Sequence, residues 1–237
     1  MSEIAVLRQM VRGSDNIVFF GGAGVSTESG IPDFRSSDGV FKLLGGISPE
    51  KALSRSHFDE NPQAFFNFYR KTMVFPNAKP NMAHDKLAEL EQAGKVRAVI
   101  TQNIDGLHQK AGSRTVIELH GSAERNYCMD CERKYPMAFV LDSDGIPRCV
   151  CGGIVRPDIV MYEEPLDHRT KRLAYNFIDE ADMLIVAGSS LVVYPAAGFV
   201  RDFHGRYLVL INRSDTPYDG KANLVIRGSV GEVLNLL

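Results

Sequence analysis

The sequence predicts an α/β fold in which a parallel sheet is covered by helices on both faces. Short runs of Val, Ile and Leu alternate along the chain with segments that have the apolar period of an amphipathic helix. The runs are continuously apolar, as is typical of strands buried on both faces of a parallel sheet. A glycine-rich segment directly after the first run supports this class, because dinucleotide-binding units begin in this way.

The elements follow in order from these patterns. An amphipathic helix is predicted over 2–12, ending at Gly13, and a helix capped by Asn81 is predicted to run to Gly94. Further helices are predicted over 49–53, 62–72, 167–180, 195–203 and 229–237. Strands are predicted over 17–20, 96–100, 116–119, 183–187, 207–211 and 224–226. The aromatic residues of 62–72 favour packing in a core, with the lining of an apolar ligand channel as the alternative.

The glycine segment carries more polar chemistry than a turn requires. Gly22 and Gly24 are separated by one residue, and residues 32–35 add a proline, a carboxylate, an aromatic ring and a guanidinium. Glycines let backbone N–H groups approach a pyrophosphate, and a following helix N-terminus favours its negative charge. The spacing is not a strict G-x-G-x-x-G motif, so the glycines alone fit an ordinary turn about as well. The polar residues that follow favour a ligand site.

Small or polar residues follow five of the predicted strands. They are residues 21–24, 101–105, 120–121 and 188–190, together with Asn212. Sheets of this class bind ligands beyond the carboxyl ends of their strands. The sequence therefore predicts a ligand site at that edge of the sheet.

Composition and charge exclude several classes of partner. The chain has 237 residues, 44% of them hydrophobic and 24% charged, which indicates one large globular domain with a small insertion. The net charge of −2 and the scattered basic residues argue against direct nucleic-acid binding. No apolar run reaches the roughly 18 residues that span a bilayer, and the N-terminus lacks the basic region of a signal peptide. We therefore expect a cytoplasmic protein without a membrane partner, with a monomer as the default.

All four cysteines lie within 24 positions, as Cys128 and Cys131, then seventeen residues, then Cys149 and Cys151. In the cytoplasm such a set favours a metal site over disulfides. The spacing predicts a small ribbon in which four thiolates bind one tetrahedral zinc ion, although the second pair has one intervening residue where two are usual. Buried free thiols are the alternative. Four thiolates leave no open coordination position, so the zinc would be structural and its removal would unfold the insertion.

Taken together, the motifs resemble those of the sirtuins, a family of NAD-dependent protein lysine deacylases, and in particular its compact bacterial members. The matching segments are residues 22–26, 29–36, 101–108, 119–121 and 188–191, the four cysteines and Asn212. The resemblance implies a Rossmann-like NAD-binding domain made of residues 1–35, 76–122 and 157–237. It implies a smaller lobe made of a helical insertion, 36–75, and a zinc-ribbon insertion, 123–156.

The resemblance also implies roles for individual residues. NAD would lie in the cleft between the lobes, and an acyl-lysine peptide would enter from the opposite side. The implied NAD contacts are Gly22, Ala23, Gly24, Thr27, Phe34, Arg35, Gln102, Asn103, Ile104, Asp105, His120, Gly188, Ser189, Ser190, Asn212 and Val230. The implied peptide contacts are Val160, Met161, Tyr162, Val192 and Val193, which would pair with the peptide as an added strand.

The implied reaction is NAD-dependent lysine deacetylation or broader deacylation, in which the acyl group passes to ADP-ribose and nicotinamide is released. His120 would be the general base, a task that suits an imidazole titrating near neutral pH. Asp105 would orient the carboxamide of nicotinamide. Protein mono-ADP-ribosyl transfer in the same cleft is the enzymatic alternative, and a non-catalytic NAD-binding or zinc-ribbon module is the alternative from another class.

Three positions depart from the sirtuin pattern. Gly21 stands where threonine is frequent, which would loosen the loop, and Glu163 stands where glycine is frequent, which would change the peptide groove. Tyr69 is followed three positions later by Thr72 rather than by arginine, which argues against a preference for acidic acyl groups. The choice between acetyl and longer apolar acyl groups stays open at this stage.

Overall fold

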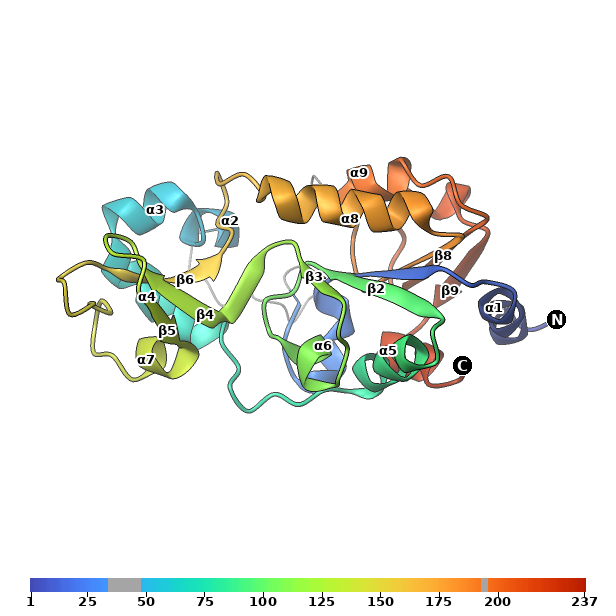
Figure 1. The fold of residues 1–237 in the computed structure, drawn as a ribbon, viewed down its shortest axis with the longest axis horizontal. Coiled ribbons are helices and arrows are strands. Elements are labelled where there is room, and N and C mark those ends of the chain that lie inside the picture. The colour runs from blue at the N-terminus through green and yellow to red at the C-terminus, as the bar shows by residue number, and fades with distance from the viewer. Residues whose placement is uncertain (34–47, 193–195) are drawn as a thin grey trace.

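The larger part of the molecule is built on a six-stranded parallel sheet (Figure 1). The computed structural model describes residues 1–33, 48–192 and 196–237. The strands are β1 (Ile17–Gly21), β2 (Val96–Thr101), β3 (Val116–Glu118), β7 (Met183–Ala187), β8 (Tyr207–Asn212) and β9 (Leu224–Arg227). Their order, β3-β2-β1-β7-β8-β9, reverses direction between β1 and β7, as in doubly wound dinucleotide-binding sheets. The predicted parallel sheet is confirmed.

Helices cover both faces of this sheet (Figure 1). The helices α1 (Glu3–Arg12), α5 (Met82–Gln92) and α10 (Val230–Leu234) pack on one face, and α8 (His168–Glu180) and α9 (Ala196–Arg201) on the other. Leu7 and Leu87 share one core cluster with Phe19, whereas Ile178 shares the other with Phe20. Successive side chains of a strand point to opposite faces, so the two neighbouring phenylalanines of β1 enter different cores.

Side-chain caps set the predicted starts of the helices. Asn81 accepts a hydrogen bond from the Ala83 N–H (2.9 Å) before α5, and Asp167 accepts one from the Thr170 N–H (2.8 Å) before α8. Such caps satisfy N–H groups that have no partner within the helix. Each predicted helix is present, with its ends within three residues of the expected positions. The short helix α3 (Arg55–Glu60) was not predicted.

A smaller antiparallel sheet forms a second body, in the strand order β5-β4-β6. Its strands are β4 (Gly121–Cys128), β5 (Lys134–Pro136) and β6 (Val155–Ile159). One core cluster joins this sheet to α3, α4 (Pro62–Thr72) and α7 (Met137–Leu141), and α2 (Pro49–Ala52) precedes them in the chain. Phe65 and Phe66 of α4 are completely buried in that cluster, so they pack in a core, as the sequence favoured. The boundaries of the two lobes stay a prediction, which the shared core supports.

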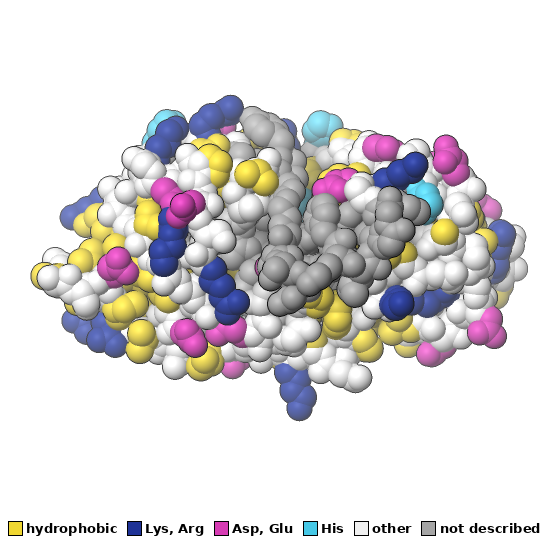
Figure 2. Space-filling model, turned by 180° about the vertical axis from the view of Figure 1, so that it is seen from behind, with side chains coloured by type: hydrophobic (Ala, Val, Ile, Leu, Met, Phe, Trp, Pro, Cys, Tyr) yellow, Lys and Arg dark blue, Asp and Glu magenta, His cyan; other side chains and the backbone are white. Residues whose placement is uncertain are grey.

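The surface shows no single-sign charge patch on the face opposite to that of Figure 1, where basic and acidic side chains are interspersed among the described residues (Figure 2). Within the described ranges, every helix is too short or too polar to cross a lipid bilayer.

Candidate functional site

A cavity of about 780 Å³ opens at the carboxyl ends of the parallel strands. It is lined by residues that directly follow β1, β2, β7, β8 and β9, and by residues of the smaller body such as Leu53, Met73 and Met161. The point at which the strand order reverses, between β1 and β7, lies at this edge. Ligands of doubly wound sheets bind at such a point, so the predicted site edge coincides with this cavity.

Glycines bring the loops after β1 and β7 into direct backbone contact. The Gly24 N–H donates to the Gly188 carbonyl at 2.8 Å. A Cβ on Gly24 would lie 2.7 Å from the Gly188 Cα, and a Cβ on Gly188, whose φ is 60°, would lie 2.4 Å from the Val25 nitrogen. No side chain fits between these loops. The same closeness leaves a backbone surface that a pyrophosphate can approach.

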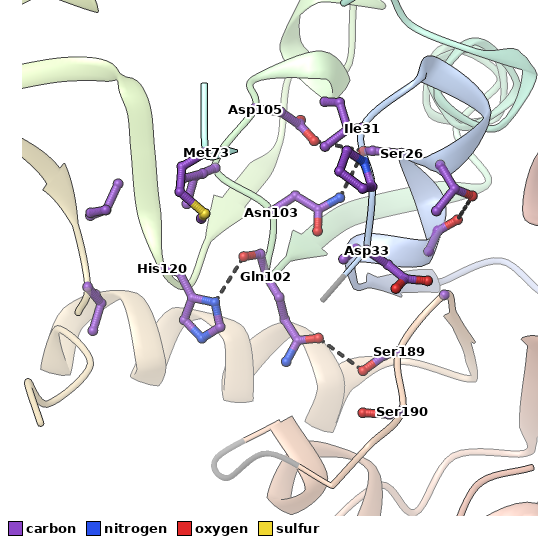
Figure 3. A pocket seen from close by; sticks show the side chains of 18 of the residues that line it. Ser26, Ile31, Asp33, Met73, Gln102, Asn103, Asp105, His120, Ser189 and Ser190 are labelled. Atoms are coloured by element: carbon purple, nitrogen blue, oxygen red, sulfur yellow. Dashed lines mark hydrogen bonds between the residues drawn. The ribbon is translucent and has the colours of Figure 1, made fainter. Parts of the chain in front are cut away.

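Ser26 joins two of the polar residues that follow β2. Its Oγ–H donates to Asp105 Oδ2 at 2.7 Å, and its Oγ accepts from Asn103 Nδ2 at 3.0 Å (Figure 3). The other carboxylate oxygen of Asp105 accepts from the Leu107 N–H at 2.9 Å, at the start of α6 (Leu107–Lys110). Asp105 is therefore oriented before any ligand binds. Ser26 was not among the predicted site residues, although its place inside the glycine segment was an available signal.

His120 follows β3 and lines the cavity beside Gln102 (Figure 3). Its Nδ1 lies 2.9 Å from the Gln102 carbonyl oxygen. A carbonyl only accepts, so Nδ1–H is the donor and the neutral ring carries its lone pair on Nε2. Burial lowers the pKa of His120 below its usual value, and the bond to the Gln102 carbonyl opposes part of this shift. The imidazole is therefore neutral near pH 7, as a general base must be.

Gln102 links His120, through its backbone carbonyl, to the loop after β7, through its side chain. Its Oε1 accepts from Ser189 Oγ–H at 3.0 Å (Figure 3). The Ser189 N–H in turn donates to Asn212 Oδ1 at 3.0 Å. Asn212 Nδ2 is buried and has no partner among the described residues. Because Asn212 lines the cavity, this unused donor is available to a hydroxyl or carbonyl of a bound ligand.

Most of the predicted NAD contacts line this one cavity. They are Ala23, Gly24, Thr27, Gln102, Asn103, Ile104, Asp105, His120, Gly188, Ser189, Ser190, Asn212 and Val230. Gly22 does not line it and instead packs against Gly188 and Gln102, where an added Cβ would come within 2.8 Å of each. Phe34 and Arg35 lie outside the described residues.

The predicted peptide contacts divide into two groups. Val160, Met161 and Tyr162 line the cavity, whereas Val192 does not and is 59% exposed. Val193 lies outside the described residues. These five assignments stay predictions.

The smaller body supplies lining residues that the sequence patterns did not single out. Leu53 and Met73 reach the cavity from segments next to α2 and α4, beside Thr72 at the end of α4, which the sequence singled out only for its spacing from Tyr69. Their neighbours Phe65 and Phe66 do not line it, which excludes these two rings from the alternative of an aromatic ligand channel. No motif marks Leu53 or Met73, because their role depends on where the helices pack.

The four cysteines form a compact metal centre away from the cavity. Their Sγ atoms all lie within 4.8 Å of one another. The Sγ atoms of Cys128 and Cys151 are 3.4 Å apart, and those of Cys131 and Cys149 are 3.5 Å apart. A tetrahedral zinc ion with Zn–S bonds of about 2.3 Å requires about 3.8 Å between sulfurs, so the set fits a zinc ion. No cysteine lines the cavity, which agrees with a structural ion.

Comparisons with known proteins agree with this geometry. Residues 22–195 match the model of the Sir2 family. A curated relative from Clostridium perfringens (strain 13 / Type A), named NAD-dependent protein deacetylase, is 57% identical over 236 residues, covering 98% of this chain and 97% of the relative.

Two solved structures have the same fold. One is described as Sir2 with a deacetylated p53 peptide and 3'-O-acetyl ADP ribose; it has a TM-score of 0.91 and 40% identity, and the match covers 99% of this chain and 97% of that one. The other is described as Sir2 with a p53 peptide and NAD+; it has a TM-score of 0.85 and 41% identity, over 99% of this chain and 96% of that one.

Proposed function

This chain belongs to the Sir2 family, and from that premise we propose that it is an NAD-dependent protein deacetylase. The acyl group of an acyl-lysine peptide passes to ADP-ribose, and nicotinamide is released. The observation that carries the proposal is the neutral His120, whose Nε2 lone pair lies in the same cavity as the oriented Asp105. A protein that only binds NAD has no use for a base held in one tautomer.

The residues present fit NAD. The close approach of Gly24 and Gly188 leaves bare backbone for the pyrophosphate, and the unused Nδ2 of Asn212 suits a ribose hydroxyl. When bound, NAD supplies a ribose carbon that becomes electrophilic as nicotinamide leaves. Asp105, whose carboxylate is already held by Ser26 and the Leu107 N–H, would orient the carboxamide.

His120 moves the proton that the acyl transfer requires. With NAD and an acyl-lysine bound, its Nε2 would accept the proton of a ribose hydroxyl, and that oxygen would take the acyl group while the lysine nitrogen leaves as the free amine. The Nδ1–H bond to the Gln102 carbonyl holds the ring and stabilises the positive charge that then develops on it. The Gln102 bond to Ser189 keeps this segment fixed against the loop after β7.

The substrate side of the cavity is apolar. Leu53, Met73 and Ile104 line it, which suits the aliphatic stem of lysine and a neutral acyl group. The segment that carries Val160 and Met161 lies beside them and suits a peptide main chain. We also expect the protein to act as a cytoplasmic monomer, which size-exclusion chromatography with light scattering tests.

The direct test is mass spectrometry of an acetyl-lysine peptide incubated with the purified protein, with and without NAD. We expect NAD-dependent loss of the acetyl group together with O-acetyl-ADP-ribose. ADP-ribose attached to protein, with the acetyl group retained, would instead indicate mono-ADP-ribosyl transfer. Tight NAD binding without any cleavage in the presence of the peptide would contradict both enzymatic functions.

A further inference from the structure

The segment 160–164, which follows β6, is tied to the start of α3 by backbone pairing. The Tyr162 N–H donates to the Leu53 carbonyl and the Tyr162 carbonyl accepts from the Arg55 N–H, both at 3.0 Å. Two positions earlier, the Val160 N–H donates to the His120 carbonyl at 3.0 Å. One edge of this segment is therefore already paired within the protein.

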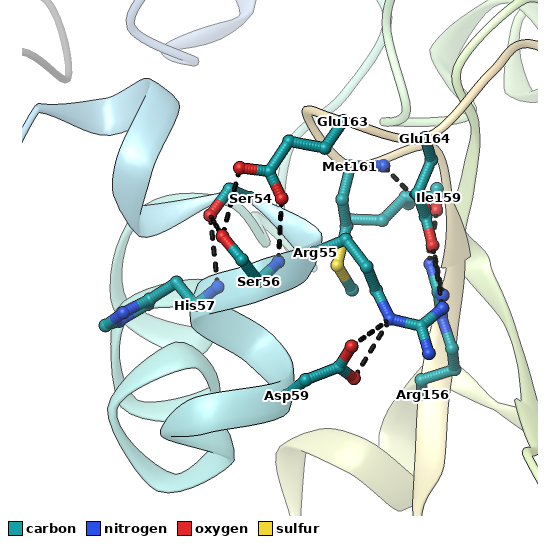
Figure 4. A network of polar contacts seen from close by, with 10 residues as sticks. All are labelled: Ser54, Arg55, Ser56, His57, Asp59, Arg156, Ile159, Met161, Glu163 and Glu164. Carbon is teal, nitrogen blue, oxygen red and sulfur yellow. Dashed lines mark hydrogen bonds and ion pairs between the residues drawn. The ribbon is translucent and has the colours of Figure 1, made fainter.

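Glu163 adds a side-chain clasp to the same helix (Figure 4). Its Oε2 accepts from the Ser56 N–H at 2.9 Å, and its Oε1 accepts from the Ser56 Oγ–H at 3.0 Å. The Ser56 Oγ also lies 3.1 Å from the Ser54 Oγ, and Ser54 caps α3 by accepting from the His57 N–H. Both carboxylate oxygens of Glu163 are therefore used on the first turn of α3.

The side chain of Glu164 ties the segment to the interior of the smaller body. Glu164 accepts from Arg156 at 2.7 and 3.0 Å, from Arg55 at 3.2 Å and from the Met161 N–H at 2.9 Å (Figure 4). Arg156 is only 4% exposed, so this pairing takes place in the interior of the smaller body. The Arg156 guanidinium holds the pKa of Glu164 below its usual value, against the effect of burial, which raises it. Glu164 therefore holds the segment to Arg156 in the interior, and Glu163 holds it to Ser56 of α3.

The backbone of Glu163 has an unusual conformation and unused hydrogen-bonding groups. Its φ is 75°, in the left-handed region that glycine tolerates and other residues rarely adopt. Its own N–H and C=O make no hydrogen bond within the described parts of the chain. Glu163 lies in a turn that the Glu164 N–H closes on the Met161 carbonyl at 3.1 Å, so its own two backbone groups can pair with an added strand.

We propose that Glu163 is a positioning residue for the peptide substrate, holding segment 160–164 against α3 so that the edge of this segment is formed before the peptide binds. The proposal rests on the proposed function, since it takes that segment as the peptide-binding one. A preformed edge lowers the entropic cost of pairing with an extended peptide. The clasp acts on peptide affinity and leaves NAD binding and the acyl-transfer step unchanged.

Three substitutions separate this role from the alternatives. Glu163→Gly removes the carboxylate and relieves the positive φ, Glu163→Gln keeps an acceptor for the Ser56 N–H but removes the charge, and Ser56→Ala removes one of the two bonds. Glu132→Gly is the matched control, because Glu132 is also a glutamate at positive φ (60°) and lies outside the cavity.

We expect Glu163→Gly to raise the KM for an acetyl-lysine peptide about three- to tenfold, the equivalent of roughly one net hydrogen bond. The kcat, the KM for NAD and the thermal midpoint should stay close to those of the parent protein. Ser56→Ala should raise the peptide KM less, and the double variant should be no worse than Glu163→Gly alone, because both remove the same clasp. Glu163→Gln should lie between the parent and Glu163→Gly, and Glu132→Gly should match the parent.

An unchanged peptide KM in Glu163→Gly would overturn the proposal. A second pattern would also overturn it: Ser56→Ala leaves the peptide KM unchanged, while Glu163→Gln and Glu163→Gly raise it equally. The charge of Glu163 would then act on the peptide directly. Hydrogen exchange measures the clasp without depending on enzyme activity. Glu163→Gly should speed exchange at the Tyr162 and Arg55 amides. Unchanged exchange would also overturn the proposal. If the parent protein does not deacetylate the peptide, but Glu163→Gly still speeds exchange at these amides, the proposed function is refuted and the clasp is retained.

Discussion

The parallel sheet and the cysteine ribbon lie in one chain but are stabilised in different ways. Every residue of β1 and β7 is buried, and apolar clusters fill both faces of the sheet. In the ribbon, no residue of β5 is fully buried, Cys131 and Cys151 are exposed, and the charged Arg156 occupies the interior of the same body. Apolar burial is the main source of stability for the sheet, whereas the ribbon has too small a core and needs a metal cross-link.

This difference explains where the reacting groups lie. A sheet packed on both faces holds the loops at its strand ends rigidly, which lets Ser26 and Gln102 orient Asp105 and His120 through hydrogen bonds of 2.7 to 2.9 Å. The smaller body contributes apolar lining instead, together with the segment that we propose binds the peptide. His120 lies at the junction, since its side chain contacts the residue after β2 and its carbonyl accepts from Val160.

Removing the metal should have the largest effect. A strong chelator, or Cys128→Ser combined with Cys149→Ser, should unfold the ribbon, because four thiolates without an ion have nothing to hold them together. Hydrogen exchange should become fast over 123–156 while β1 and β7 stay protected, and deacetylation should be lost. Protection that persists in the ribbon after complete metal removal would show that its apolar core suffices.

Replacing His120, the proposed general base, should lower the rate without unfolding either region. His120→Ala should reduce the deacetylation rate by about 10²- to 10⁴-fold, the usual contribution of general-base catalysis. The thermal midpoint should change little, because the side chain makes a single hydrogen bond. Steady-state kinetics with His204→Ala, an exposed histidine, gives the control. Equal activity of the two variants would exclude His120 as the base.

Forcing apart the loops after β1 and β7 should have a smaller effect, which changes only the KM for NAD. Gly188→Ala forces a Cβ to within 2.4 Å of the Val25 nitrogen at a φ of 60°, which costs about 1–3 kcal/mol. We expect the KM for NAD to rise about tenfold, since about 1.4 kcal/mol is a factor of ten. Gly220→Ala, where an added Cβ meets nothing within 4 Å, should behave as the parent. Equal KM values for NAD in both variants would contradict the inference that the close contact of Gly24 and Gly188 shapes the NAD site.

Acidification should destabilise the sheet gradually. Burial lowers the pKa values of His84, His108 and His120 below 6.5 in the folded protein, and nearby Asp105 and Asp85 oppose the shift at His84. Protonation therefore favours the unfolded chain, so stability is complete above about pH 6.5 and falls below it, by at most about 1.4 kcal/mol per pH unit for each histidine.

Urea unfolding between pH 7.5 and 5.5 measures this slope. The two ring nitrogens of His108 have no hydrogen-bond partner in the described residues, so His108→Leu should fold and show a shallower slope. A midpoint that does not change over this pH range would contradict the assignment of neutral buried imidazoles. Deacetylation by the parent should also rise with pH up to the pKa of His120 and then level off.

Local sequence patterns predicted the larger sheet almost completely. Its strands are continuous apolar runs, so their burial on both faces and hence their parallel arrangement could be read without a structure. The spacing of the cysteines likewise predicted a set of four converging thiolates, which the structure brings within 4.8 Å. The predicted site residues after β2 and β7 lie together because the carboxyl ends of parallel strands share one edge.

The sequence by itself determined the strands of the larger sheet, the class of that sheet, the four clustered cysteines and the edge that carries the site, because periodicity and spacing are local properties of a chain. Only the tertiary structure decided that Ser26 orients Asp105 and that Leu53 and Met73 line the cavity. The clasp between Glu163 and Ser56 joins residues 107 positions apart. Such contacts depend on how separate elements pack against each other, and no local pattern records that arrangement.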